Sequence, residues 1–410
     1  MSTEIAALIS KLGIKIPDKL DPQNQVLIIE SQQDMRMICV HHLQKRQFHN
    51  ILQASTGLEA IEMLEGLAKE GKHCNLVVCS QELPSMTGID FVEEVQARLS
   101  LNRCAITISL ANVTKEKILR CVESGIDEII AKPFTLGDII PKLTSAFKKF
   151  NNPKNPELVY EFAKAKVREG DLDLAEKIYK VLCNTSTNSA RPYVGLANIA
   201  LKRDQPEEGF QHLQTAEEKN PNFVHTFVLR GELYSKQQKW DEALECYQKS
   251  IELSPLNPIR YIQVATILLE LKRYQDIIET LDIAKKHEID FPHLYHYYSQ
   301  AYFFLKEYKH AVRYVGMALK HDPTNLDYLN QQAIAMKSQG DHEGAMKSYN
   351  LIIKQDPDNI KSLYNKAILL KDIGRVPDAI KVLERLAEKK PDFQQGLKKL
   401  EELRELGKAS

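Results

Sequence analysis

EEKNP at residues 217–221 is followed by IELSP at 251–255, and similar phrases return as LKHDP at 319–323, IKQDP at 353–357 and AEKKP at 387–391. The prolines that end these phrases fall on one grid of 34 residues, whose only gap is Ile289. A fixed period of this length indicates a repeat architecture. Because proline marks the end of a helix, each phrase predicts the end of one helical unit.

Two further columns follow the same period. With the proline at position 32, units begin at residues 156, 190, 224, 258, 292, 326 and 360. Position 8 is always small, and position 20 is small in every unit but the fourth, where Ile277 stands. Position 24 is bulky throughout, and three units place glycine near position 15. This pattern predicts two closely packed helices per unit, joined by a turn.

The pattern resembles the tetratricopeptide repeat (TPR) and extends over seven repeats at residues 156–393, with a capping helix and tail at 394–410. Single units bury little apolar surface, so stacked units are expected to share a core in an all-α solenoid. The resemblance implies that the array binds a protein or peptide on its inner face. Position 5 contains no lysine, which argues against a carboxylate clamp for a chaperone tail.

Inner-face positions 2, 5, 9 and 12 lie along one helical stripe that is apolar in the later units. The predicted partner groove consists of Ile259, Ile262, Leu269, His296, Phe303, Ile334 and Tyr364. The alternative is that these side chains pack against neighbouring helices. His293 and His296 have helical spacing without a nearby carboxylate or cysteine, so no metal site is predicted.

Residues 25–150 alternate apolar, β-branched runs with helical stretches. Strands are expected at residues 25–30, 49–54, 75–80, 105–110 and 128–131, with helices at residues 34–45, 57–70, 88–97, 115–124 and 138–149. This order predicts an α/β domain with a five-stranded parallel sheet in flavodoxin-like order. A ligand site would lie at the carboxyl ends of the strands.

The phrases VLIIESQQDMR, NLVVCSQELPSMTGIDF and GIDEIIAKPF resemble bacterial response-regulator receiver domains. The resemblance implies a pocket built from Glu30, Ser31, Ser80, Glu82, Leu110 and Lys132. Of the residues on which receivers depend, only Lys132 is intact. Ser80 replaces the phosphoacceptor aspartate, Ser31 one member of the Mg²⁺-binding acidic pair, and Leu110 the switch hydroxyl.

One glutamate makes a poor Mg²⁺ cage, and serine does not accept phosphate in this transfer without activation. The sequence therefore predicts a pseudo-receiver with no catalytic residue, no phosphoacceptor, no metal and no cofactor. Glu82 has two interpretations: it pairs with Lys132, or it is a solvated loop carboxylate.

Composition narrows the functional class. The chain has 410 residues with 55 basic and 55 acidic side chains, which argues against nucleic-acid binding. No apolar stretch is long enough to span a membrane, and seven cysteines without a CxxC pair favour reduced thiols in the cytoplasm. Residues 1–24 are expected to be an extension with a short amphipathic helix, and residues 151–155 a short linker.

The leading hypothesis is a non-enzymatic adaptor in bacterial signalling, motility or assembly, with a protein partner on the repeats. Its receiver face, built from Lys115–Ser124, Glu128–Ala131 and Asp138–Lys149, would self-associate or bind a second protein. Two alternatives stay open: an atypical response regulator still modulated by phosphorylation or a ligand, and a regulatory adaptor subunit of an enzyme.

Overall fold

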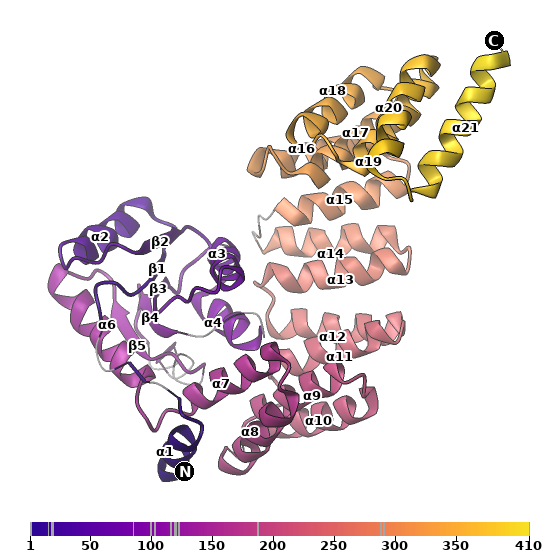
Figure 1. The fold of residues 1–410 in the computed structure, drawn as a ribbon. Helices are drawn as coiled ribbons and strands as arrows, with labels where there is room; N and C mark the ends of the chain where they lie inside the picture. Colours follow the sequence, from indigo (N-terminus) through magenta and orange to yellow (C-terminus); the bar gives the residue numbers. More distant parts are fainter. Residues whose placement is uncertain are drawn as a thin grey trace. The chain divides into compact units, whose positions relative to one another are not determined.

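The computed structural model describes the chain except at positions 1, 15, 18–19, 85, 99–100, 102–103, 115–116, 119–120, 122–123, 187, 288, 290–291 and 410. The described residues divide into two compact units. The first consists of residues 1–263 with 284–289, and the second of residues 264–283 with 290–410. The first unit contains an α/β domain followed by helix pairs, and the second continues the series of pairs (Figure 1).

Five parallel strands form one sheet in the order β2–β1–β3–β4–β5, which confirms the flavodoxin-like prediction. The strands are β1 (Val26–Ile29), β2 (Ile51–Ala54), β3 (Leu76–Ser80), β4 (Ala105–Leu110) and β5 (Glu128–Ala131). The central strands β1, β3 and β4 are buried along their whole length, as expected for a parallel sheet covered on both faces. Their parallel register brings the ends of β1, β3 and β4 to one edge.

Alternate residues of the strands feed two separate cores. Val26 and Ile28 pack in one cluster with residues of α2 (Gln33–Gln44) and α6 (Leu136–Phe150). Leu27 and Ile29 pack in the other with residues of α3 (Gly57–Lys69) and α4 (Gly88–Ala97). This alternation follows from the period of two along a strand. The helix predicted at residues 115–124 lies for the most part outside the described residues.

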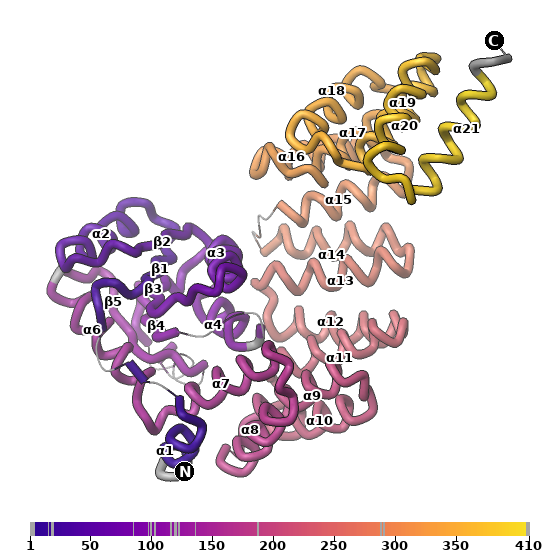
Figure 2. Tube along the Cα trace, in the orientation of Figure 1, coloured from indigo at the N-terminus to yellow at the C-terminus, as the bar shows by residue number. Residues whose placement is uncertain are grey.

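The rest of the described chain is a series of seven helix pairs followed by a last helix, which confirms the predicted solenoid; the Cα trace in Figure 2 follows them along the chain. The pairs are α7 (Pro156–Glu169) and α8 (Leu172–Thr185), α9 (Arg191–Lys202) and α10 (Pro206–Lys219), α11 (Val224–Lys236) and α12 (Trp240–Leu253), α13 (Pro258–Glu270) and α14 (Tyr274–Lys286), α15 (Pro292–Phe304) and α16 (Tyr308–His321), α17 (Leu326–Gln339) and α18 (His342–Gln355), and α19 (Ile360–Asp372) and α20 (Val376–Lys389). The last helix is α21 (Gln394–Ala409), whose Leu400 and Leu403 are buried in one cluster with residues of α19 and α20.

Every unit turns at position 15 through a residue with positive φ. Three units use glycine there, at Gly170, Gly340 and Gly374. The other four force a side-chain-bearing residue into the same left-handed conformation, at Asp204, Gln238, Lys272 and Lys306. The turn is therefore fixed by the packing of the two helices rather than by glycine alone.

Small residues allow the close helix approach that the columns predicted. At Gly231, a Cβ atom would lie 2.9 Å from the ring of Tyr247, the bulky residue at position 24 of the same unit. Ala163, Ala197 and Ala333, also at position 8, are completely buried. In this unit the small residue at position 8 thus lets the two helices approach until the Tyr247 ring fills the space between them.

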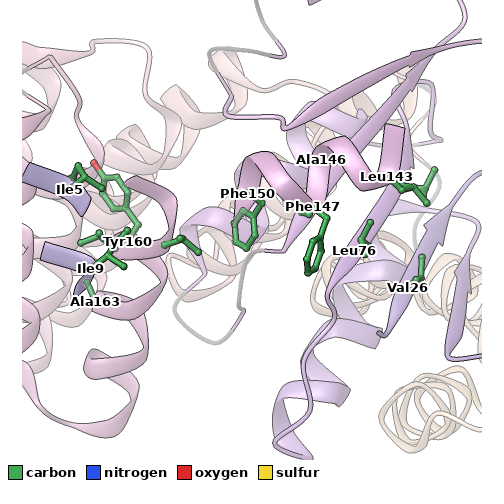
Figure 3. Packing of buried hydrophobic residues seen from close by; sticks show 14 of the residues in the cluster. Ile5, Ile9, Val26, Leu76, Leu143, Ala146, Phe147, Phe150, Tyr160 and Ala163 are labelled. Carbon is green, nitrogen blue, oxygen red and sulfur yellow. The ribbon is translucent and has the colours of Figure 1, made fainter. Parts of the chain in front are cut away.

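The amino-terminal helix α1 (Ser2–Lys11) packs on the first repeat. Its Ile5 and Ile9 are buried in one apolar cluster with Tyr160 of α7 (Figure 3). Phe147 and Phe150 of α6 belong to the same cluster, which continues into the sheet. One hydrophobic core therefore runs from the α/β domain into the first repeat.

The short join between α6 and α7 is tied by hydrogen bonds. The Asn155 side-chain amide donates to the carbonyl oxygen of Phe150 at 2.7 Å. Its oxygen accepts from the backbone N–H of Glu157 at 3.1 Å and so caps α7. Within the parts of the chain that the structure describes, no helix is long and apolar enough to cross a membrane.

Candidate functional site

The carboxyl ends of three strands bring together three of the predicted pocket residues. Glu30 follows β1, Ser80 ends β3 and Lys132 follows β5. The Lys132 ammonium donates to the Glu30 carboxylate at 2.6 Å and to the Ser80 hydroxyl at 2.8 Å. Glu30 and Ser80 are buried, so the charge pair is shielded from water.

The remaining hydrogen bonds complete this network. The Ser80 hydroxyl donates to the carbonyl oxygen of Glu82 at 3.3 Å, and the second Glu30 oxygen accepts from the Gln32 N–H at 3.1 Å. Ser31 lies half-buried beside Glu30, and Leu110 is completely buried and brings no hydroxyl to the pocket. The side chains of Lys132, Glu30 and Ser80 thus form hydrogen bonds within the pocket itself.

Glu82 lies apart from this network. Its carboxylate accepts from the Ala111 N–H at 3.4 Å and lies 4.0 Å from the Lys117 ammonium. Its side chain is 43% exposed, whereas that of Glu30 is 6% exposed. The structure therefore places Lys132 on Glu30 and Ser80, and Glu82 at the rim with the character of a loop carboxylate.

The pocket offers little for a metal ion or a nucleophile. Glu30 is its one buried carboxylate among the described residues, and Lys132 already holds it. No group of three or more His, Cys, Asp or Glu side chains suited to a metal occurs in the described part of the chain. Burial, with a smaller contribution from Glu30, raises the pKa of the nearby Cys39 thiol to about 12, so this cysteine is a thiol rather than a thiolate.

A second polar site lies where α4 meets the repeats, and the sequence analysis did not predict it. Thr87 and Asp90 form a capping box that begins α4. The second oxygen of Asp90 accepts from the Ser254 hydroxyl at 2.9 Å. At the other end of α4, the Lys164 ammonium of α7 donates to the carbonyl oxygen of Val95 at 3.2 Å.

Glu94 is the centre of this second site. Its carboxylate accepts from the Arg260 guanidinium and, at 3.0 Å, from the Asn257 side-chain amide. The Nε atom of Arg98, the residue that follows α4, lies 3.5 Å from the other oxygen. Glu94 and Arg260 are both almost completely buried. Burial acts to raise the pKa of Glu94, but Arg260, His225, Arg98 and Asn257 hold that pKa below its ordinary value.

Two polar atoms beside Glu94 are left unsatisfied. The Nε atom of Arg260 and the Nε2 atom of His225 are buried and have no hydrogen-bond partner among the described residues. Burial and the positive charge of Arg260 lower the pKa of His225 to about 4, so the imidazole is neutral near pH 7. Both residues line a cavity of about 370 Å³, together with Glu94, Arg98, Asn198 and Ile259.

The residues of the predicted partner groove are all partly accessible, but in different surroundings. Ile259 packs against the apolar cluster of the α/β domain that contains α4. The Phe303 ring contacts those of Phe304 and Tyr308, and the Tyr364 ring lies edge-on to Phe393. The others are half-buried: Ile262, Leu269, His296 and Ile334.

His296 is the most enclosed polar group of that stripe. Burial lowers its pKa to about 4, and its Nε2 atom lies 2.6 Å from the Gln300 amide nitrogen. Its ring lies 5.3 Å from that of Tyr328, measured between centroids. This histidine is thus built into the helix packing of α15 and α17.

Comparison with known proteins defines both parts of the chain. Residues 26–144 match the model of the response regulator receiver domain. Residues 226–257 and 337–401 match models of the tetratricopeptide repeat. The chain is a receiver domain followed by TPR repeats, as the sequence motifs predicted.

The receiver domain is similar to chemotaxis proteins. Chemotaxis protein CheY-3 of Vibrio cholerae serotype O1 is 29% identical over 130 residues, which cover 32% of this chain and 96% of that protein. Chemotaxis protein CheY of Pseudomonas aeruginosa is 26% identical over 127 residues, covering 31% of this chain and 98% of that protein.

Solved structures of TPR proteins are also similar. The C-terminal part of a TPR repeat-containing protein from Cytophaga hutchinsonii has a TM-score of 0.47 at 16% identity and covers 58% of this chain and 97% of that one. YrrB, described as a TPR protein with an unusual peptide-binding site, has a TM-score of 0.38 at 18% identity, covering 45% of this chain and 95% of that one.

Proposed function

We propose that this protein is a non-enzymatic adaptor whose receiver domain has lost phosphoaspartate signalling and whose repeats bind a protein partner. The observation that carries the proposal is the Lys132 ammonium, which bonds at once to Glu30 and to Ser80. At the end of β3 the pocket offers a hydroxyl instead of a carboxylate. A hydroxyl cannot form the acyl phosphate on which receiver signalling depends.

The same contact explains why Mg²⁺ would bind poorly. A hard cation needs several oxygen ligands, and Glu30, the one buried carboxylate among the described residues of the pocket, is neutralised by Lys132. A metal ion would have to displace an ammonium at 2.6 Å. Mg²⁺ is therefore expected to bind this pocket poorly while Lys132 stays paired with Glu30.

Several features support a role in bacterial signalling within the cytoplasm. The relatives of the receiver domain are chemotaxis proteins, which fits signalling or motility. Six of the seven cysteines are buried, as expected for reduced thiols in a reducing compartment. Receiver domains and TPR arrays are not catalytic families, which agrees with an adaptor.

Incubation with acetyl phosphate and Mg²⁺, followed by intact-protein mass spectrometry, tests the loss of phosphorylation. The expected result is no phosphate adduct on the wild-type chain. A stable adduct that disappears in Ser80→Ala would contradict the proposal and would support the atypical response regulator instead.

Affinity purification tests the partner groove. Phe303→Glu places a charge in the apolar stripe and should abolish partner capture while the chain remains folded. Ile283→Glu is the matched control, because Ile283 is exposed and does not occupy an inner-face position. Equal capture by both variants would reject the predicted groove.

A further inference from the structure

We infer that the surface formed by Lys164, His225, Ser254, Asn257 and Arg260 is a binding site for an acidic helix of a partner protein. In this structure the chain's own helix α4 occupies that site. The partner would present carboxylates at the spacing of Asp90 and Glu94 and would compete with α4. The inference rests on the proposed adaptor function and adds to it the chemistry of the partner.

Two acidic side chains of α4 match the polar groups of the site. Asp90 and Glu94 are four residues apart, so both carboxylates lie on one face of α4. Ser254 binds the first carboxylate, whereas Asn257 and Arg260 bind the second. The site is thus suited to bind a helix that has two acidic residues one turn apart.

The α4 contact is packed differently from the junction between α6 and α7. The junction of α6 with α7 is an apolar core, with Phe147, Phe150 and Tyr160 buried together. The α4 contact instead combines buried charges with a cavity of about 370 Å³ and unsatisfied nitrogens on Arg260 and His225. Interfaces that open and close are more polar and less completely packed than permanent ones.

Two opposing free-energy terms act on the buried ion pair of Glu94 and Arg260. Burying a carboxylate and a guanidinium loses their hydration, and their mutual attraction returns roughly that loss. The ion pair therefore specifies which surface docks without making the docked state strongly favoured. A free helix with the same charges can then compete, although the tethered α4 has an effective concentration on the order of millimolar.

A peptide of residues 87–98 (TGIDFVEEVQAR), labelled for fluorescence anisotropy, is the probe for the site. It is titrated with the full-length wild-type chain and with full-length Glu94→Lys, in which repulsion from Arg260 should release the internal α4. The peptide should bind Glu94→Lys at least about tenfold more tightly than wild type, a difference near 1.4 kcal/mol. Equal, weak binding to both chains would overturn the inference.

Two matched changes test the chemistry of recognition. The peptide with Glu94→Gln should bind Glu94→Lys protein at least about tenfold more weakly than the original peptide. Adding Arg260→Gln to the Glu94→Lys protein should produce a similar loss. Undiminished binding in either case would mean that the site does not select a carboxylate, which contradicts the inference.

Hydrogen exchange on the full chain keeps the test valid if the peptide is too short to form a helix. Glu94→Lys should accelerate exchange over residues 87–98 and 254–263 while the strands β1, β3 and β4 stay protected. Glu128→Gln is the control, because Glu128 pairs with Lys142 and Lys149 of α6 rather than with the repeats. If hydrogen exchange is unchanged in Glu94→Lys, the Glu94 contact does not keep α4 on the site, and the inference is contradicted.

Two further outcomes distinguish binding of an external acidic helix from self-association and from failure of the proposed adaptor function. Dimerisation of Glu94→Lys in light scattering would mean that the opened site takes a second copy of the chain, which overturns the assignment to an external helix. If peptide binding fails while capture through Phe303 persists, the inference is wrong and the adaptor function stands.

Discussion

Glu30 of the receiver pocket and Glu94 of α4 are both buried carboxylates that meet a cation, but their surroundings differ. Lys132 bonds to Glu30 and also to Ser80, and all three side chains belong to one α/β domain. Glu94 meets Arg260 of the repeats beside a cavity that leaves nitrogens of Arg260 and His225 unsatisfied. The Glu30–Lys132 pair lies within one packed domain, whereas the Glu94–Arg260 pair joins the α/β domain to the repeats.

This difference determines what happens when a partner is removed. In the receiver pocket, a carboxylate left without its ammonium stays buried unless the domain unfolds. At the α4 contact, a carboxylate left without its guanidinium regains water when α4 leaves the repeats. The same chemistry is therefore expected to support folding in one place and docking in the other.

The largest effect should come from Lys132→Met. This change leaves Glu30 buried without its cation and should lower the free energy of unfolding of the receiver domain by about 3–5 kcal/mol. Urea denaturation followed by circular dichroism measures it. Lys142→Met is the control, because Lys142 is 44% exposed and its loss should change stability by less than about 1 kcal/mol. An unchanged free energy of unfolding in Lys132→Met would show that Glu30 can reach water without its lysine partner.

Removing both charges of the Glu30–Lys132 pair tests whether the unpaired charge causes the loss of stability. Glu30→Gln combined with Lys132→Met removes both charges and should recover most of the stability lost by Lys132→Met alone. If the double variant is as unstable as the single one, packing of the lysine stem, not the charge pair, stabilises the strand ends.

A smaller effect is expected from Arg260→Met at the α4 contact. The stranded Glu94 should weaken docking by about 2–3 kcal/mol, yet the receiver domain should keep its unfolding free energy, because α4 can undock. Hydrogen exchange over residues 87–98 and 254–263 reports docking, and urea denaturation reports folding. Loss of receiver stability equal to that in Lys132→Met would remove the distinction between the two sites.

The docking should also depend on pH through His225. Its pKa is about 4 when docked, because of burial and Arg260, and returns towards 6.5 when the site opens. The open state therefore binds a proton that the docked state excludes, so docking is at full strength above pH 6.5 and weakens as pH falls towards 4. Between pH 6.5 and 5 the loss of docking free energy should be about 1.5 kcal/mol.

Exchange measurements at several pH values, corrected for intrinsic rates, test this dependence. His225→Gln should flatten the profile between pH 6.5 and 5, with Glu94, Arg260 and Arg191 as the charges that act on this site. His296→Gln is the matched control, since His296 also has a pKa near 4 but lies among residues of α15 and α17. A profile that follows His296 would contradict the assignment.

The sequence predicts much of this molecule because its signals are local. The strands β4 and β5 and the helix α4 have the predicted bounds, since each is a short apolar or amphipathic run between breakers. The 34-residue columns predict the helix pairs because small residues face bulky side chains, as Gly231 faces Tyr247 and Gly209 faces Leu233. The receiver motifs named Glu30, Ser80 and Lys132 together, and the structure joins their side chains where parallel strands end at one edge.

Other features have no local signal. Four of the seven turns place Asp204, Gln238, Lys272 and Lys306 in a left-handed conformation that their propensities disfavour, so only the three glycines marked the turn. Glu94 and Arg260 are 166 residues apart, and each is an ordinary charged residue on a helix. Their pairing depends on how the first repeats fold against the receiver domain, which no single segment encodes.

The smallest effect should come from Glu82, the exposed carboxylate at the rim of the receiver pocket. Its side chain is 43% exposed and meets Lys117 only at 4.0 Å, so Glu82→Gln should change the free energy of unfolding by less than about 0.5 kcal/mol. Glu30→Gln, the matched change at the buried site, should be clearly more destabilising because it removes a partner of Lys132. Urea denaturation of both variants measures the gap. Equal losses of unfolding free energy in the two variants would mean that Lys132 pairs with Glu82 as well as with Glu30 in solution. The contact between Lys132 and Glu30 would then be one of two alternative ion pairs.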